Sequence, residues 1–475
     1  RAHPRSRFIC GPGREMPRLA KRRIQLARTL SVIAESCSSY SSRQIALRIR
    51  LGRMNGNRLI IAGKKTPYPS CLTKPLFFFQ RVKGPEDSGV VLICGAVNWD
   101  LSGRKQPPKG CKGTANPRNL YVPHRLTPFE NIKVKLVVSG SSACHSILVT
   151  EEGKVNEKSQ LGTGNQTKQD SPVQVEALKE HTIVGAATGR NHSIFLTGKF
   201  LSSLGIRYKG PPIVKVAAGA EFSVILDVRG TMHSFGSPEY GQLGHGTTGE
   251  YIAQANKITY HYEKAPKAIV MFVEKSKETG QVPLEPADVL DISCGTNHTV
   301  CIDSKKRVFS WGFGGYGRLG HAEPKDELVP RLIKLFTVQN RNIKSVHCGS
   351  SYCLAVSEHG AVYFFGQTKK TGEAWMYPKP IQDLHGWNVR SVGCANTSIV
   401  IAADESVIAW GPSPAYGELG LGDIRKTSPA PAEVKKLDGI HIHQVTCGYS
   451  HTLMIARADS EEEKSKIENL PDYDP

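Results

Sequence analysis

The stretch VTCGYSHTLMI at 445–455 decides the fold, because six further copies of the same phrase precede it in the chain. Each copy has a β-prone stretch, a Gly, a few variable residues, a His or aromatic with Ser or Thr, and then more apolar residues. The other copies are VVSGSSACHSILV at 137–149, AATGRNHSIFL at 186–196, VAAGAEFSVIL at 216–226, ISCGTNHTVCI at 292–302, VHCGSSYCLAV at 346–356 and VGCANTSIVIA at 392–402, where Ala395 replaces the Gly. Recurrence at about 50 residues predicts a repeat array.

The rest of the unit indicates what each repeat forms. Complete copies continue with an aromatic–Gly pair and then a Gly-x-Leu-Gly turn, as in Trp311-Gly312 and Gly317–Gly320. Short alternating runs between these markers suit half-buried strands, and the glycines suit tight turns. Four short strands per unit, arranged radially, describe propeller blades. Seven copies therefore predict an all-β, seven-bladed propeller.

The two ends of the array are complementary. Leu92–Gly95 has strand character but precedes the first copy without a full repeat, and no aromatic–Gly strand follows Gly448. We therefore expect the N-terminal strand to complete the last blade and close the ring, since closure removes exposed sheet edges.

Longer runs carry a family resemblance. They are GAVNWDL at 95–101, FSWGFGGYGRLGH at 309–321, AADES at 402–406 and IAWGPSP at 408–414. With the repeat itself, they make residues from about 84 to 470 resemble the regulator of chromosome condensation repeat family, and within it a mitotic, telophase-disk-associated type.

The resemblance implies a propeller scaffold that binds a small GTPase of the Rac, Ral, Arf or Ran type, with guanine-nucleotide exchange as its candidate activity. It also implies roles in mitosis, at chromosomes and centromeres, on spindle microtubules and in cytoskeletal signalling. The expected locations are the nucleus, nucleolus, chromosomes, spindle and cytoplasm. We expect a monomer without a membrane span. A chromatin or microtubule adaptor without exchange activity is the alternative.

Most of the positive charge lies in a leader, residues 1–83. The chain has a net charge of +20, and the leader holds 19 Lys and Arg against Glu15 and Glu35, which leaves +17 there and +3 in the remainder. Such a segment can bind polyphosphate through counterion release, or can be a solvated, disordered tail. Its Arg- and Ser-rich composition also matches a mitochondrial presequence, so a mitochondrial relative is a second alternative, and residues foreign to the native protein are a third.

Two repeats are short and one is long. The segments 150–165 and 197–213 lack part of the unit, which indicates either thin blades tolerated through neighbour contacts or a splice or gene-model variant. Residues 247–291 are an insertion, whose apolar runs at 258–262 and 268–273 predict a projecting strand pair. Loops on a rigid scaffold often carry binding function.

The motifs do not indicate catalysis. GFGGYG at 312–317 matches GxGxxG, but a turn into a strand follows it, where a dinucleotide site needs a helix. The repeated His residues at 145, 192, 298 and 451 are expected to be buried imidazoles that donate to a carbonyl of the neighbouring blade. We call the Gly of each phrase, or Ala395 in its place, the marker position. The cysteines directly before it are interpreted as reduced structural thiols: Cys294, Cys348, Cys394 and Cys447. We expect no catalytic residue, cofactor site or metal site.

The expected organisation is a leader at 1–83, a propeller at 84–458 with an inserted hairpin at 247–291, and a charged tail at 459–475. Partner contacts are expected from loop residues that the repeat does not require. These candidates are Asn98, Trp99, Asp100, Glu239, Tyr240, Tyr260, Tyr262, Phe313, Tyr316, Arg318, Tyr416 and Glu418.

Overall fold

The computed structural model describes most of the chain after the leader, within a unit that spans Phe77–Pro475. The described residues are 85–97, 119–158, 172–197, 208–253, 257–276, 278, 280–338, 341–368, 373–412 and 416–475. The leader, and the candidates Asn98, Trp99 and Asp100, lie outside them. Among the described residues, no helix combines the length and apolar character that a membrane crossing requires.

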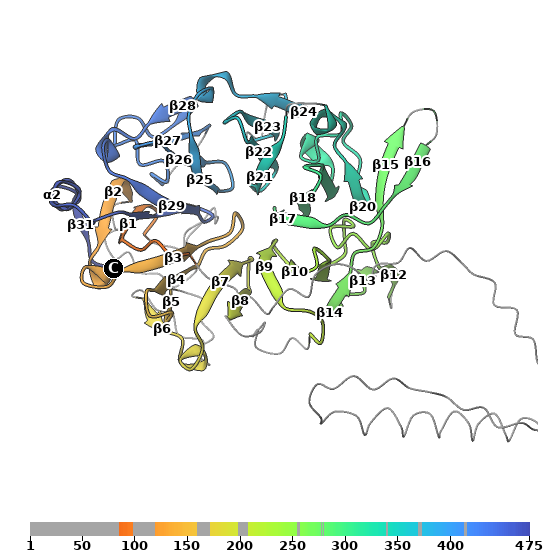
Figure 1. Ribbon diagram of the computed structural model, residues 1–475, viewed down its shortest axis with the longest axis horizontal. Coiled ribbons are helices and arrows are strands. Elements are labelled where there is room, and N and C mark those ends of the chain that lie inside the picture. Colours follow the sequence, from red (N-terminus) through yellow and green to blue (C-terminus); the bar gives the residue numbers. More distant parts are fainter. Residues whose placement is uncertain are drawn as a thin grey trace, which may run out of the picture. The chain divides into compact units, whose positions relative to one another are not determined.

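Five blades, each drawn from one stretch of chain, are present among the described residues (Figure 1). Four of them are four-stranded sheets, and the four strands of the third blade below belong to a six-stranded sheet. The first three consist of β3 (Val134–Val138), β4 (Ser146–Thr150), β5 (Val155–Lys158) and β6 (Val173–Gln174); β9 (Ile213–Ala218), β10 (Phe222–Asp227), β11 (Met232–Gly236) and β14 (Glu263–Ala268); and β17 (Val289–Cys294), β18 (His298–Asp303), β19 (Val308–Gly312) and β20 (Glu327–Leu332). The other two consist of β21 (Ile343–Cys348), β22 (Tyr352–Ser357), β23 (Val362–Gly366) and β24 (Trp375–Pro380); and β25 (Val389–Cys394), β26 (Ile399–Ala403), β27 (Ser406–Gly411) and β28 (Ser428–Glu433).

Two further sheets differ from these blades. A composite sheet has the order β29–β30–β1–β2–β31 and takes strands from both ends of the described chain. Its strands are β29 (Ile442–Cys447), β30 (His451–Ala456), β1 (Val90–Gly95), β2 (Leu120–Leu126) and β31 (Asp472–Tyr473). The other sheet contains only β7 (Ile183–Thr188) and β8 (Ser193–Thr197) among the described residues.

The prediction of seven blades is therefore wrong: the part of the chain that the structure describes has five, and the expected closure of a seven-bladed ring by an N-terminal strand is not shown. The error has a physical cause. A repeated phrase specifies only the inner strand pair of a blade, and the outer pair needs its own length of chain. Between Gly189 and Gly219 that length is missing, so the β7–β8 pair has no outer strands among the described residues.

The insertion pairs differently from the expected strand pair. β12 (Glu250–Ile252) pairs with β13 (Ile258–Tyr260), and β15 (Phe272–Ser276) pairs with β16 (Gly280–Leu284). β14, between these hairpins, is the outer strand of its blade. The β15–β16 hairpin joins β20 through a parallel pairing and extends away from the sheets in Figure 1.

Short helices complete the fold. The 3-10 helices are η1 (Thr127–Phe129), η2 (Glu176–Leu178), η4 (Gly315–Gly317), η5 (Lys334–Thr337), η6 (Gln382–Leu384) and η7 (Lys435–Leu437). The α-helix α2 (Glu461–Glu468) begins with a capping box, in which the Ser460 side chain accepts from the Glu463 backbone and the Glu463 side chain accepts from the Ser460 backbone. Ile467 of α2 is buried in the core, so the tail packs on the composite sheet.

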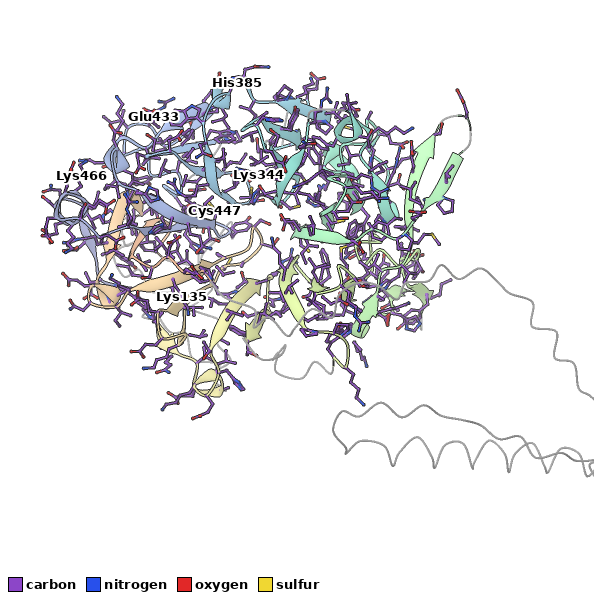
Figure 2. All side chains as sticks on the ribbon, viewed as in Figure 1. Lys135, Lys344, His385, Glu433, Cys447 and Lys466 are labelled. Carbon is purple, nitrogen blue, oxygen red and sulfur yellow. The ribbon has the colours of Figure 1, made fainter. Side chains whose placement is uncertain are left out.

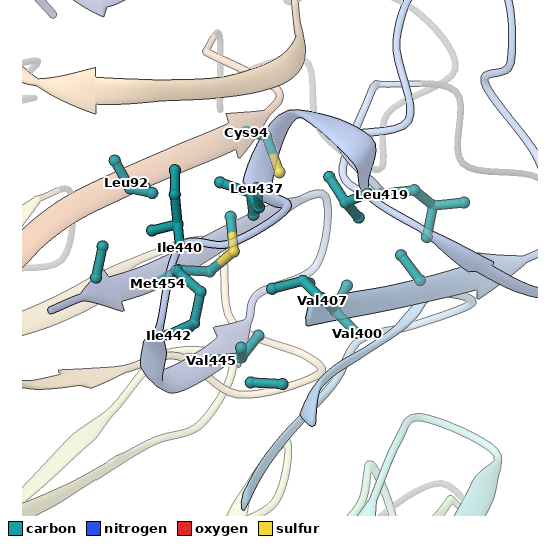
Figure 3. Packing of buried hydrophobic residues seen from close by; sticks show 14 of the residues in the cluster. Leu92, Cys94, Val400, Val407, Leu419, Leu437, Ile440, Ile442, Val445 and Met454 are labelled. Carbon is teal, nitrogen blue, oxygen red and sulfur yellow. The ribbon is translucent and has the colours of Figure 1, made fainter. Parts of the chain in front are cut away.

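Buried apolar side chains lie between neighbouring sheets. In one cluster, Leu92 and Cys94 of β1 lie among Val407 of β27 and Ile442 and Met454 of β29 and β30 (Figure 3). Residues more than three hundred positions apart therefore share one core. Burial of this kind is the main favourable term in the stability of the fold.

The glycine that ends the third strand of a repeat is required by close packing. Gly312 has φ +101°, and an added Cβ would lie 2.5 Å from the Asn297 carbonyl oxygen. Gly236 has φ +111° and is equally close to the Glu221 carbonyl oxygen. These contacts hold the end of the third strand against the loop of the repeated phrase. The turns that carry most of the candidate residues begin at this end of the strand.

Candidate partner-binding surface

The turn Gly-x-Leu-Gly links each of three sheets to the next. In each case the backbone carbonyl of residue x accepts a hydrogen bond from a side chain of the following sheet. The pairs are Trp311 Nε1 with Gln242 at 2.9 Å, Cys353 Sγ with Arg318 at 3.2 Å, and Thr452 Oγ1 with Glu418 at 2.7 Å. The turn therefore has a structural role, because its backbone links neighbouring sheets.

Residue x also folds its side chain back onto its own turn. The Tyr416 backbone N–H donates to Glu418 Oε2 at 3.1 Å, and the Tyr240 backbone N–H donates to Gln242 Oε1 at 2.8 Å. Glu418 is 4 % exposed, and burial raises the pKa of its carboxyl to about 7. The structure therefore places Glu418 in the interior, where it holds the turn that presents Tyr416.

Arg318 occupies the same repeat position in the blade of β17–β20, but its side chain interacts with aromatic rings. Its guanidinium carbon lies 4.6 Å from the Phe313 ring centre and 5.6 Å from the Tyr316 ring centre. Its Nε donates to the Gly315 carbonyl at 2.9 Å, and another guanidinium nitrogen donates to the Ser350 carbonyl at 3.1 Å. Burial lowers the pKa of Arg318 to about 10, so the group stays cationic at neutral pH. It thus holds Phe313 and the half-exposed Tyr316 in place on the turn. We call the surface formed by Tyr240, Phe313, Tyr316 and Arg318 the rim.

Tyr240 connects this group to the preceding blade. Its ring centre lies 5.0 Å from that of Phe313. Desolvation, followed by the charge of Glu239, raises the pKa of Tyr240. Desolvation and the charges of Glu239 and Glu250 raise the pKa of Tyr260. Tyr240 therefore contacts Phe313 of the next turn, and Glu239 and Tyr240 interact electrostatically with Tyr260 of the insertion.

The β12–β13 hairpin has an exposed apolar face. Glu250 pairs with Tyr260, and Ile252 pairs with Ile258, so these four residues lie on one face of the two-stranded sheet. Ile252 is 72 % exposed and Ile258 is 54 % exposed. On the other face, the Tyr251 ring stacks on His261 with ring centres 4.0 Å apart. We call the face formed by Glu250, Ile252, Ile258 and Tyr260 the hairpin face.

Tyr262 follows the hairpin and contacts a loop of the blade. Its hydroxyl donates to Glu221 Oε2 at 3.4 Å, and Arg190 lies 3.2 Å from the other carboxylate oxygen of Glu221. These contacts are exposed, so they orient the groups more than they stabilise the fold.

The structure does not bring all the candidates together. Glu239, Tyr240, Tyr260, Phe313 and Arg318 are joined by the contacts above. Tyr262 and Tyr316 extend from this group. Tyr416 follows β27, which lies across the sheets from β13 in Figure 1, and it is not among the contacts that join the group around Tyr240.

Sequence reasoning missed Ile252, Ile258 and Glu221. The two isoleucines lie within the insertion, and their exposure could not be distinguished from core packing until the pairing of β12 with β13 was known. Glu221 lies inside a repeated phrase, where the variable positions carried no separate signal.

The arrangement is suited to binding a protein. Exposed apolar side chains beside aromatic rings and carboxylates are typical of protein interaction sites. The rim supplies rigid contacts, because Arg318 and the turn carbonyls hold it on the scaffold. The fold and this surface together define a repeat propeller of the scaffold class.

Comparison with known proteins identifies the family. The regulator of chromosome condensation (RCC1) repeat matches residues 155–196, 229–302, 306–356 and 404–455, and a second model of that repeat matches 213–242 and 289–318. Protein RCC2 of Mus musculus is 48 % identical over 445 residues, which are 87 % of this chain and 86 % of the relative. Protein RCC2 of Homo sapiens is 47 % identical over 455 residues, covering 89 % of this chain and 87 % of the relative. The chain belongs to the RCC1 repeat family, with RCC2 proteins among its relatives.

A solved structure supports the fold alone. Prp20p of Saccharomyces cerevisiae, whose binding properties to Gsp1p and histones have been characterised, aligns with a TM-score of 0.61 and 16 % identity. The alignment covers 81 % of this chain and 95 % of Prp20p. The resemblance drawn from the repeated phrase and the longer runs is thus confirmed at the level of the family.

Proposed function

We propose that this chain is a scaffold that binds a small GTPase and promotes exchange of its guanine nucleotide, in mitosis and at chromosomes, the spindle and the cytoskeleton. Family membership supports the proposal, as does the likeness of fold to Prp20p, which has been studied for binding to Gsp1p. The observation that carries it is the hairpin face, where Ile252 and Ile258 are exposed and Tyr260 interacts electrostatically with Glu239 and Tyr240.

Exchange needs no catalytic acid or base in this mechanism. The propeller binds the nucleotide-free GTPase more tightly than the loaded form, and linkage lowers nucleotide affinity by the same factor. The hairpin face supplies apolar contact area, while Glu239 and Glu250 supply negative charge. A rigid rim limits the entropy lost on binding.

A nucleotide-release experiment tests this proposal. We expect the full chain to accelerate release of a fluorescent GDP analogue from one member of a panel of Ran, Rac, Ral and Arf types. Ile252→Asp places a charge in the centre of the hairpin face, and should reduce the acceleration at least about tenfold, because apolar contacts at an interface centre dominate affinity. Ile252 is exposed, so the free energy of unfolding should change by less than about 0.5 kcal/mol.

Ile424→Asp is the matched control, since Ile424 is an isoleucine that is fully exposed and follows β27, which lies across the sheets from β13 in Figure 1. It should leave the acceleration unchanged. Equal loss in both variants would contradict the assignment of the surface. No acceleration by the folded wild-type chain on any GTPase would contradict exchange.

The basic leader favours a second candidate function, an adaptor for chromatin or microtubules. Its charge of +17 predicts counterion release on a polyanion. Affinity of the full chain for duplex DNA should then fall at least about 10³-fold between about 50 and 200 mM salt, and deletion of 1–83 should remove most of this dependence. Fluorescence anisotropy at several salt concentrations measures the slope. An unchanged slope after the deletion would locate binding on the propeller instead.

A further inference from the structure

The histidines of the repeated phrase join neighbouring sheets through side chains. In three of the four, Nε2 lies within hydrogen-bond distance of a hydroxyl in the next sheet, where sequence reasoning expected a carbonyl. The pairs are His451 with Ser146 at 2.7 Å, His145 with Ser193 at 2.9 Å, and His192 with Ser223 at 2.9 Å. A neutral imidazole beside a hydroxyl is a structural contact, and nothing more is required of these three.

We call each of these contacts between neighbouring sheets a junction. At the junction between the blade of β17–β20 and the blade of β21–β24, a sulfur atom takes the place of the hydroxyl and a second thiol lies nearby. His298 Nε2 of β18 lies 3.1 Å from Cys353 Sγ of β22. Cys348 Sγ, at the end of β21, lies 3.7 Å from Cys353 Sγ. The Nε2 and the two sulfur atoms all lie within 4.8 Å of one another. His298 and Cys353 are 0 % exposed, and Cys348 is 6 % exposed.

The combination is specific to this junction among the described residues. Cys447 and Cys394 occupy the same position before a marker as Cys348, but the preceding sheets present Ser398 and Tyr352 where β18 presents His298. The residue equivalent to Cys353 is Ile399 in the sheet of Cys394 and Thr452 in the sheet of Cys447. Only here do an imidazole and two thiols converge.

The donor set matches the preferences of zinc. Tetrahedral Zn²⁺ bonds sulfur at about 2.3 Å and nitrogen at about 2.0 Å, which sets the two sulfurs about 3.8 Å apart and each about 3.5 Å from the nitrogen. The observed sulfur separation of 3.7 Å already meets this. The His298–Cys353 distance needs to open by only about 0.4 Å. Two thiolates and a neutral imidazole also neutralise the ion, which a buried site demands.

We propose that His298, Cys348 and Cys353 bind one Zn²⁺ between the blade of β17–β20 and the blade of β21–β24. Binding displaces one proton from each thiol to solvent, while the imidazole binds as the neutral base. The three protein donors leave one tetrahedral position for water. Cys348 lines a central channel of about 380 Å³, to which Cys447 also contributes (Figure 2), so one of the three donors faces this channel. The ion would fasten two adjacent blades of the scaffold.

Metal analysis of the reduced full chain tests the site. After removal of metal and addition of Zn²⁺, we expect Cys353→Ser to bind about one Zn²⁺ fewer per chain than the wild type. The substitution restores the hydroxyl found at the other junctions, so the variant should fold. Co²⁺ in place of Zn²⁺ should give thiolate-to-metal charge-transfer absorption in the wild type that weakens in Cys353→Ser, because two thiolates are ligands only in the former.

Cys447→Ser is the matched control, because Cys447 is a buried cysteine at the repeat position of Cys348 and the preceding sheet presents Ser398 to it, where β18 presents His298. It should retain the wild-type zinc content and cobalt spectrum. Equal zinc content in the wild type and Cys353→Ser would overturn the proposal. An equal loss in Cys353→Ser and Cys447→Ser would also overturn it, since a general disturbance of the core would then explain both.

Discussion

Replacing Glu418 by Gln is expected to stabilise the protein at pH 8 by up to about 3 kcal/mol. Burial raises the pKa of the carboxyl from 4.5 to about 7, with only part of the desolvation offset by hydrogen bonds from the backbone and Ser398. A neutral amide avoids that desolvation. It also fits the site, because Gln242 makes the equivalent contact to the Tyr240 backbone at 2.8 Å in another blade.

The pH dependence has a definite sign. The folded chain holds the Glu418 proton more tightly than the unfolded chain, so the free energy of unfolding falls as pH rises from about 4.5 to about 7 and is constant beyond that for this group. Urea unfolding at pH 5 and pH 8 should therefore separate wild type from Glu418→Gln mainly at pH 8. Gln242→Glu is the reciprocal control and should destabilise at pH 8. A Glu418→Gln effect that is the same at both pH values would contradict the ionisation argument.

Truncation of Trp311 to Ala is expected to lower the free energy of unfolding by about 3–5 kcal/mol. The ring is 0 % exposed and packs in a core with Phe222, Phe272 and Phe309. Its Nε1 donates to the Gln242 carbonyl at 2.9 Å, which joins two blades. The substitution therefore opens a cavity and removes a link between sheets.

Trp311→Phe separates these two effects. Phe235 and Phe365 hold the same position in sister blades, so the smaller aromatic is compatible with the fold. Loss of the hydrogen bond should cost about 1 kcal/mol, well below the cost of the alanine variant. Urea denaturation of both variants gives the comparison. Equal losses would indicate that the hydrogen bond dominates, and a loss under about 1 kcal/mol for Trp311→Ala would show that the cavity collapses.

Candidate residues could be predicted only in part, because burial and contacts in the folded chain determine what each turn position does. Gln242, Arg318 and Glu418 occupy one repeat position and looked alike in the sequence. In the structure, Arg318 lies between aromatic rings and fixes the rim, while Glu418 is buried and holds a turn. Arg318 contacts two rings of its own turn and the Ser350 carbonyl of the next sheet, whereas Glu418 accepts from Tyr416 and Ser398. Burial in the folded chain, which the repeat position does not specify, decides between the two roles.

The insertion shows the same limit. Its composition predicted strands that project, but the apolar run at 268–273 contributes to β15, which pairs with β16, while β13 pairs with β12. Alternation of side chains cannot identify the partner of a short strand. The exposure of Ile252 and Ile258 follows from the pairing and could not be predicted before it.

By itself, the sequence determined the repeat, the strands and turns of each unit and the family, because these depend on local periodicity and on glycines at positions of close backbone approach. Tertiary structure alone decided how many blades form. A blade needs four paired strands, and pairing depends on chain length and on partners far away, as β1 and β30 of the composite sheet illustrate. It also decided the convergence of His298 with Cys348 and Cys353, since side chains from two repeats meet only when their sheets pack together.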